Sequence, residues 1–352
     1  MNNIKRIQSC LPLRTAALIE CPRNRRYLTG FVSSYGSLLV TRDTATLLTD
    51  CRYIEAAQAT VTNCAVEEVK TGRLRALCKL HGVKKLWLES SATLARVKQL
   101  RDALPGVYAT AGRALDAPLK QMREIKGEAE VAKIRAAQRI AEAAFAQVVP
   151  SITVGMTERD VALALDFAML RGGAERLSFD TIVAAGVNGA KPHAVPGDYA
   201  LQAGDLITMD FGAVVNGWHS DMTRTVALGE PAAQAREVYD VVLEAQLAAL
   251  AAIAPGVACK DVDAAAREVI KAAGYGEHFR HGTGHGVGLA VHEEPRLSEK
   301  SRDVLRPGMV VTVEPGVYLP GVCGVRIEDL VVVTDTGYEN LTACAKDFLQ
   351  LV

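Results

Sequence analysis

Five potential metal ligands lie between residues 210 and 328, each in a short apolar or glycine-rich segment that is typical of a β-strand. Burying an ionised carboxylate without a partner costs several kcal/mol or forces the group to take up a proton. Because four of the five groups are carboxylates and the fifth is an imidazole, we expect them to converge on cations. This donor set favours two divalent ions, such as manganese, cobalt or zinc, over a thiolate-rich structural zinc site. The five residues are Asp210, Asp221, His285, Glu314 and Glu328.

A predicted hairpin places the first two carboxylates. An Asn-Gly dipeptide at residues 216–217 favours a two-residue turn between two strand-like segments. The resulting register sets Asp221 opposite Gly212 and Asp210 opposite Thr223. The two carboxylates then share one face, at roughly 7–8 Å between their backbones. Either one alone would be more typical of a solvated acid at a hairpin end, but together, beside apolar neighbours, they predict a shared ion.

The charge balance excludes several classes of partner. Among 352 residues, Lys plus Arg and Asp plus Glu each number 40, so no net field draws in nucleic acid or an anionic membrane. A small neutral or zwitterionic substrate fits this balance. The N-terminus lacks the apolar core of a signal peptide, and no later stretch is apolar enough to cross a membrane. The eight cysteines show no CxxC pairing, so we expect a cytoplasmic protein with reduced thiols.

The chain changes character near residue 120. Residues 1–120 alternate short strand-like and helix-like segments, which predicts a small α/β domain with a mixed sheet. The pattern of apolar residues differs from residue 124 to 352, where it begins with a long amphipathic helix over residues 128–149. We place the boundary within residues 116–123. The strand-like and helix-like segments of the first domain are residues 15–19, a hairpin at 37–48, and then residues 53–59, 74–81, 85–88 and 92–104.

The second domain contains an internal repeat. The pattern of residues 155–161 recurs 101 residues later at 256–262, and an alanine and a glycine that follow recur at the same offset. A repeat of this length is too long for a solenoid and predicts two related α+β halves about a pseudo-twofold axis. Two candidate ligands come from the first half and three from the second, so we expect the metal centre where the halves meet.

Several motifs together resemble the creatinase and methionine aminopeptidase superfamily, and within it the Xaa-Pro peptidases, aminopeptidase P and prolidase. This resemblance implies a pita-bread catalytic domain over residues 124–352, in the α+β class, preceded by a small creatinase-like α/β domain over residues 1–120. It spans nearly the whole chain, and all five ligand positions occur in the family's order and spacing. The matching segments are residues 24–31, 47–59, 183–198, 209–226, 281–295, 311–318 and 324–333.

Carried over by position, the resemblance implies a dinuclear centre. Asp210 and Asp221 are expected to bind one metal, with Asp221 bridging, and His285 and Glu314 to bind the other, with Glu328 as the second bridge. The resemblance also makes Glu314 the general base. Two divalent cations, manganese or alternatively cobalt or zinc, would share an activated hydroxide as the nucleophile.

The resemblance also assigns residues around the metals. His193 and His292 match histidines that contact the substrate and stabilise charge on the tetrahedral intermediate. His281, Tyr318 and Arg326 match the pocket for the proline ring, and Arg326 is expected on one strand face with the bridging glutamate, which it would hold in place. A lone histidine in such segments is more often a structural residue, and a lone strand arginine is as often a surface residue.

The expected activity is hydrolysis of the bond between an N-terminal residue and a following proline, as an Xaa-Pro aminopeptidase acting on proline-containing peptides. An Xaa-Pro dipeptidase (prolidase) is the first alternative, and a non-catalytic binding module of the same fold is the second. Such modules are expected to lose metal ligands, whereas this chain keeps all five. We further expect a homodimer, with neither nucleic acid nor membrane as a partner.

Overall fold

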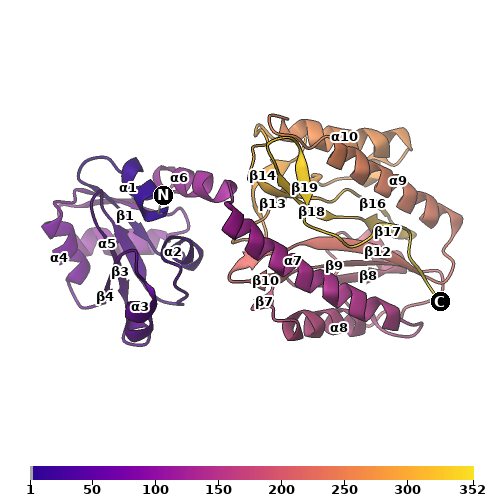
Figure 1. Ribbon diagram of the computed structural model, residues 1–352, viewed down its shortest axis with the longest axis horizontal. Coiled ribbons are helices and arrows are strands. Elements are labelled where there is room, and N and C mark those ends of the chain that lie inside the picture. The colour runs from indigo at the N-terminus through magenta and orange to yellow at the C-terminus, as the bar shows by residue number, and fades with distance from the viewer. Residues whose placement is uncertain (1–2) are drawn as a thin grey trace. The chain divides into compact units, whose positions relative to one another are not determined.

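The computed structural model describes residues 3–352, which form two compact units that meet in sequence between Arg123 and Glu124 (Figure 1). The sequence boundary at residues 116–123 falls within one continuous helix, α6 (Arg113–Glu124). None of the helices within residues 3–352 combines the length and the apolarity that a membrane crossing needs. Each unit is described separately below.

The N-terminal unit is built on a mixed six-stranded sheet with the order β4-β3-β2-β1-β5-β6. The central strand β1 (Thr15–Ile19) runs antiparallel to β2 (Ser37–Val40) and parallel to β5 (Lys85–Leu88), which confirms the predicted mixed sheet. The other strands are β3 (Ala45–Thr49), β4 (Ala65–Glu68) and β6 (Tyr108–Ala111). The helices before α6 are α1 (Asn3–Cys10), α2 (Pro22–Thr29), α3 (Ile54–Thr60), α4 (Arg73–Leu80) and α5 (Leu94–Ala103).

Helices α4 and α5 cover the same face of this sheet. Leu77 of α4 and Leu100 of α5 are buried in one cluster with Leu18 of β1 and Leu48 of β3. Fully burying a leucine contributes roughly 1.5–3 kcal/mol, so this cluster fixes both helices against the strands. Strands β1, β3 and β4 run in the same direction, because β2 is antiparallel to both β1 and β3, and β3 is parallel to β4. Their carboxyl ends therefore lie on the same side of the sheet.

The predicted hairpin register of the C-terminal unit is confirmed. In β9 (Leu206–Phe211) and β12 (Met222–Leu228), Asp210 pairs with Thr223. The turn residues Asn216 and Gly217 have φ angles of 51° and 81°, as a two-residue hairpin turn of this type requires. The ladder is interrupted around Gly212, and the tip of the hairpin, β10 (Ala213–Val215) with β11 (Trp218–His219), joins a separate three-stranded sheet with β7 (Arg176–Leu177).

The internal repeat is also confirmed. Helices α8 (Glu158–Arg171) and α10 (Cys259–Ala272) each span 14 residues and start 101 positions apart. The glycines that precede them, Gly155 and Gly256, have φ angles of 92° and 88°, a conformation that favours glycine. Within this unit α7 (Glu128–Val148) and α8 lie on one side of the strands and α9 (Ala233–Ala251) and α10 on the other (Figure 1).

Two larger sheets of this unit carry the segments of interest. The four-stranded sheet has the order β20-β12-β9-β8 and the five-stranded sheet β14-β13-β15-β18-β19, with β16 and β17 as a separate pair. The bounds are β8 (Ile182–Ala185), β13 (Gly284–Gly286), β14 (Glu293–Leu297), β15 (Val310–Val313), β16 (Gly316–Leu319), β17 (Cys323–Arg326), β18 (Asp329–Val333), β19 (Tyr338–Asn340) and β20 (Gln350–Leu351). Short 3₁₀ turns occur at η1 (Val149–Ser151), η2 (Gly186–Ala190) and η3 (Gly276–His278).

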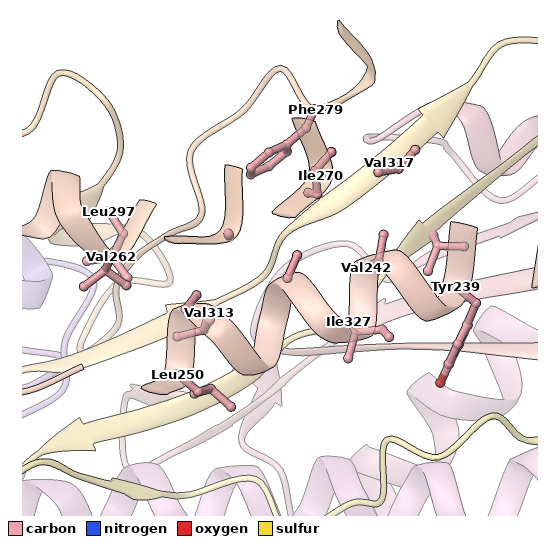
Figure 2. Close-up of a cluster of buried hydrophobic side chains, with 14 of the residues drawn as sticks. Tyr239, Val242, Leu250, Val262, Ile270, Phe279, Leu297, Val313, Val317 and Ile327 are labelled. Carbon is pink, nitrogen blue, oxygen red and sulfur yellow. The ribbon is translucent and has the colours of Figure 1, made fainter. Parts of the chain in front are cut away.

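Helices α9 and α10 pack against the strands through a large apolar cluster (Figure 2). Val242 of α9 and Val262 of α10 are fully buried in it, together with Val313 of β15 and Val317 of β16. The last two residues flank Glu314 in the chain. Packing therefore holds the backbone on either side of this candidate ligand.

Candidate metal centre

Strand ends from both halves bring the five predicted ligands together. Asp210 lies in β9 and Asp221 immediately before β12, whereas His285 is the middle residue of β13 and Glu314 follows β15. These four line a cavity of about 560 Å³. Glu328, between β17 and β18, is only 1% exposed and is not among the lining residues. The cavity is also lined by the other residues of the predicted site, His193, His281, His292, Tyr318 and Arg326.

Three carboxylates crowd at one point of this site. Asp210, Asp221 and Glu328 each offer an oxygen that lies within 4.8 Å of the other two. Asp210 Oδ1 and Glu328 Oε1 are buried, and neither has a hydrogen-bond partner within residues 3–352. Buried acceptors without donors are rare because each loses its hydration uncompensated. These two oxygens are therefore placed as ligand atoms would be.

His285 and Glu314 extend the cluster on one side. The His285 Nε2 atom lies 3.2 Å from Glu314 Oε1 and 3.6 Å from Asp221 Oδ2. The His285 Nδ1 atom is 3.1 Å from the Gly286 carbonyl oxygen, so this nitrogen carries the proton in the neutral ring. The Nε2 lone pair then faces carboxylate oxygens, an arrangement that needs a proton or a cation between the groups.

Glycine is required on the strand that carries His285. A Cβ added at Gly284 would lie 2.0 Å from the Thr312 carbonyl oxygen, and one at Gly286 would lie 2.3 Å from the Glu294 carbonyl oxygen. The prediction that His285 lies in a strand-like, glycine-rich segment is confirmed.

The electrostatics of the cluster favour added positive charge. Burial and the neighbouring carboxylates raise the pKa of Asp221 and of Glu328 well above the usual range. Burial also raises the pKa of Asp210, although Arg326 opposes this effect. Burial alone would raise the pKa of Glu314 as well, but a protonated His285, whose Nε2 then donates to Glu314, together with His281 and Arg326, lowers this pKa to about 2. Four carboxylates and one imidazole thus fit two divalent cations. These cations would replace the protons that the carboxylates with raised pKa values otherwise hold.

Arg326 connects the proline-pocket residues to the first carboxylate. Its Nη2 donates to Asp210 Oδ2 at 2.6 Å, and its Nη1 donates to the Tyr318 hydroxyl at 2.8 Å. That hydroxyl also lies 3.0 Å from His281 Nε2. A continuous row of polar contacts therefore runs from His281 to the carboxylate cluster and fixes the orientation of each side chain in it.

One sequence expectation about Arg326 is wrong. It does not share a strand with Glu328, because β17 ends at Arg326 and β18 begins at Asp329, and the two strands belong to different sheets. The guanidinium holds Asp210 rather than the glutamate. Arg326 and Glu328 meet only through Thr223, whose hydroxyl lies 3.1 Å from Arg326 Nε and donates to Glu328 Oε2 at 2.7 Å.

The two remaining histidines face the same cavity. The rings of His285 and His292 have centroids 4.3 Å apart. Burial and the neighbouring His285 lower the pKa of His292 to about 4, so its imidazole is neutral at pH 7. His193 lies in the irregular segment that follows η2.

Glu158 holds the His193 segment, and sequence reasoning missed it. Its buried carboxylate accepts hydrogen bonds from Ala185 N at 2.9 Å, Asn188 Nδ2 at 3.1 Å and Gly197 N at 3.1 Å. These donors lie on both sides of His193, so the carboxylate ties down both ends of the segment. As the first residue of α8, Glu158 carries no sequence signal that separates it from an ordinary acidic residue in a first turn.

Comparison with known proteins identifies the group to which these features belong. Residues 132–335 match Metallopeptidase family M24, and residues 15–125 match the Creatinase/Prolidase N-terminal domain. The chain belongs to metallopeptidase family M24. Its arrangement is that of the family, a creatinase-type N-terminal domain followed by a pita-bread catalytic domain.

Named M24 relatives act on Xaa-Pro bonds. The chain is 38% identical to the Xaa-Pro dipeptidase of Pyrococcus horikoshii, over 95% of this chain and 94% of that protein. The structure of an Xaa-Pro dipeptidase from Bacillus anthracis matches with a TM-score of 0.95 at 36% identity, covering 99% of both chains. The structure of an X-Pro aminopeptidase from Thermotoga maritima matches with a TM-score of 0.90 at 38% identity, covering 96% of this chain and 97% of that one. The protein is thus a hydrolase of the M24 Xaa-Pro peptidase group.

Sequence reasoning missed one further residue that lines the cavity of the candidate site. Arg296 of β14 lines the cavity and pairs directly with His285 of β13 in the antiparallel ladder. Side chains of directly opposed residues project to the same face of a sheet. Arg296 is exposed, and within residues 3–352 its side chain makes no hydrogen bond or ion pair. The only signal in the sequence was the strand register, which the bulge between His285 and Gly286 shifts.

Proposed function

We propose that the chain hydrolyses the bond between an N-terminal residue and a following proline, with Xaa-Pro dipeptides as its preferred substrates. The observation that supports the dipeptide preference is the guanidinium of Arg296, which has no partner in the described part of the chain and lies beside the metal-ligand candidate His285. A guanidinium binds a carboxylate through two parallel hydrogen bonds. In a dipeptide the free carboxylate lies on the proline itself, one residue from the bond that is cut.

The proposed ligands are Asp210, Asp221, His285, Glu314 and Glu328, and two divalent cations held by them would supply Lewis acidity and activate water at neutral pH. This chemistry suits an Xaa-Pro bond, which is a tertiary amide without an N–H for an enzyme to recognise.

The remaining roles follow from position and protonation. Glu314, with its low pKa, is ionised at pH 7 and accepts the proton of the attacking water before passing it to the leaving nitrogen. His292 is neutral and donates a hydrogen bond to the oxygen that becomes negatively charged, and His193 contacts the same end of the substrate. The row of His281, Tyr318 and Arg326 forms a wall for the proline ring.

An Xaa-Pro aminopeptidase that accepts longer peptides is the second candidate. It is the activity favoured by sequence reasoning, and the similar structure from Thermotoga maritima is named an X-Pro aminopeptidase. The exposure of Arg296 favours it, because this end of the cavity is not closed. Manganese as the native cation, a homodimer and a cytoplasmic location also belong to the proposal, and they rest on the sequence arguments alone.

A matched substrate series separates the two candidates. The protein, loaded with manganese, is offered an Xaa-Pro dipeptide, its C-terminal amide and the corresponding Xaa-Pro-Xaa tripeptide. We expect kcat/KM for the dipeptide to exceed that for the amide by at least about tenfold, since a charge-assisted bidentate pair contributes 1.4 kcal/mol or more.

The variant Arg296→Met should remove most of this difference, whereas Arg302→Met, an exposed arginine that does not line the cavity, should preserve it. Cleavage of the tripeptide alone, or equal rates on acid and amide, would support the aminopeptidase instead. Failure to cut any Xaa-Pro bond would overturn both candidates.

A further inference from the structure

The N-terminal unit contains its own cavity of about 560 Å³. Its lining residues come from the carboxyl ends of β1, β3 and β4, the start of β2, the start of α4 and one side of α5. In open α/β sheets, ligands bind in the crevice beyond the carboxyl ends of the strands. The volume lies within the range of small-molecule sites.

The charge that lines this cavity is unbalanced. Five basic side chains line it, those of Arg25, Lys70, Arg73, Arg75 and Arg96, against the single carboxylate of Glu20. Arg96 is paired with Glu20 at 2.6 Å, and Arg73 is paired with Glu67, which lies outside the lining. Three positive charges, those of Arg25, Lys70 and Arg75, therefore form no ion pair within residues 3–352, although the nearby carboxylates of Glu89 and Glu20 balance the charge of Arg25 in part.

Two of these charges are exposed, and the third is buried. Within the described residues, the side chains of Lys70 and Arg75 make no hydrogen bond or ion pair. Arg25 is only 3% exposed. Its terminal nitrogens donate to the carbonyl oxygens of Glu20, Ser33 and Gly36 at 2.6–2.7 Å, and its Nε has no hydrogen-bond partner among the residues that the structure describes. A buried guanidinium held by carbonyl groups keeps its full positive charge beside the cavity.

The start of α4 adds unpaired donors at the same place. The N-cap residue Gly72 offers no side-chain cap. Within residues 3–352, the backbone N–H groups of Leu74 and Arg75 have no acceptor. All three residues line the cavity. Free N–H groups at a helix start, together with the helix dipole, favour a bound anion.

Part of the remaining wall is apolar. Leu48, Leu100 and Leu104 are buried and line the cavity, and the Tyr35 ring, which is 45% exposed, lies among the lining residues as well. A cavity with one charged side and one apolar side suits a ligand with an anionic group and an apolar or planar body.

We propose that this cavity is a binding site for a small organic anion that carries a phosphate or carboxylate group. A merely solvated basic surface would account for Lys70 and Arg75. It would not account for a buried arginine whose Nε has no hydrogen-bond partner within residues 3–352, next to an uncapped helix start in the same cavity. The site belongs to the N-terminal unit alone and is independent of the proposed peptidase activity.

The test is isothermal titration calorimetry on the full-length, metal-loaded protein with two pairs of probes. AMP and adenosine test the phosphate group, and N-acetyltryptophan and its amide test the carboxylate. We expect at least one anion to bind at least about tenfold more tightly than its neutral counterpart, and the tighter of the two anions identifies the preferred group.

Two double variants locate the binding. In Lys70→Ala/Arg75→Ala, the affinity for the anion should fall by at least about tenfold. The control Lys79→Ala/Lys98→Ala removes the same charge from exposed positions of α4 and α5 outside the cavity, and it should change affinity by less than about twofold. Hydrolysis of Xaa-Pro peptides should be unchanged in both. No binding of either anion at millimolar concentration, equal binding of the neutral probes, or an unaffected Lys70/Arg75 variant would overturn the proposal.

Discussion

Glu328 and Asp329 are neighbours in the chain, equally buried at 1% and 0% exposure, yet they lie in opposite electrostatic environments. Glu328 has one oxygen bonded to Thr223 and one without a partner, and burial with nearby carboxylates raises its pKa well above the usual range. Burial alone would raise the pKa of Asp329 too, but Arg224 and Lys346 lower it below the usual range.

The protein supplies the Asp329 carboxylate with both positive charge and hydrogen-bond donors. Its Oδ1 accepts a hydrogen bond from Arg224 at 2.8 Å. Its Oδ2 accepts from Lys346 at 2.7 Å, Asn340 at 2.9 Å and Gln246 at 3.1 Å. Burial of a carboxylate therefore does not by itself indicate a functional site. A carboxylate that the protein leaves without compensating charge does, and the variants below test this distinction.

The largest expected effect is on activity. Glu328→Gln removes one negative charge from the proposed metal centre and should lower kcat/KM for an Xaa-Pro dipeptide by at least about 10³-fold, because several kcal/mol of stabilisation depend on the cations. Metal content per chain should fall with it, while the metal-free variant should be as stable as the wild type or more stable. Retention of both full activity and metal would remove Glu328 from the ligand set.

The opposite result is expected for Asp329→Asn. The change leaves the buried Arg224 and the adjacent Lys346 without a counter-charge, so the free energy of unfolding of the metal-free protein should fall by about 3–5 kcal/mol. Urea unfolding measures this value, with Glu328→Gln as the matched control of equal charge change. If both variants lost the same stability, the contrast between the two residues would be refuted.

A smaller loss of activity should separate the ligands from the other residues of the cavity. His292→Ala should lower kcat by about 10²-fold, as the loss of one donor to the oxyanion does. Metal content should be unchanged, because His292 is not a proposed ligand. His278→Ala, a half-buried histidine outside the cavity lining, is the control. Loss of metal from His292→Ala would make it a ligand instead.

The smallest effect concerns pH. In the metal-free protein the raised pKa values of Asp221 and Glu328 let the folded state hold more protons than the unfolded chain above about pH 4. The free energy of unfolding of the wild type relative to Glu328→Gln should therefore fall as pH rises from about 4 towards 7, by roughly 1.4 kcal/mol for each unit of raised pKa. The comparison is made with the variant because His292, whose pKa is lowered to about 4, contributes an opposite slope to both proteins. Thermal unfolding across this range measures the difference, which saturating metal should remove. A difference that rose with pH without metal would contradict the expectation.

Local patterns in the sequence were sufficient for much of the scaffold. The Asn-Gly turn fixed the register that pairs Asp210 with Thr223, and the repeated glycines marked the starts of α8 and α10. Helix α2 was missed because its buried face includes the polar residues Asn24 and Arg25, which hide the apolar period. Strand β4 was missed because it is a half-exposed edge strand.

By itself the sequence determined which side chains are ligand candidates, because a carboxylate in an apolar strand is already anomalous within its own segment. Only the tertiary structure decided that Arg326 holds Asp210, that Arg296 faces the cavity beside His285, and that Asp329 is neutralised by the protein. Each of those outcomes depends on which distant segments meet, and the charge of a buried group is balanced by its neighbours in space rather than by its neighbours in the chain.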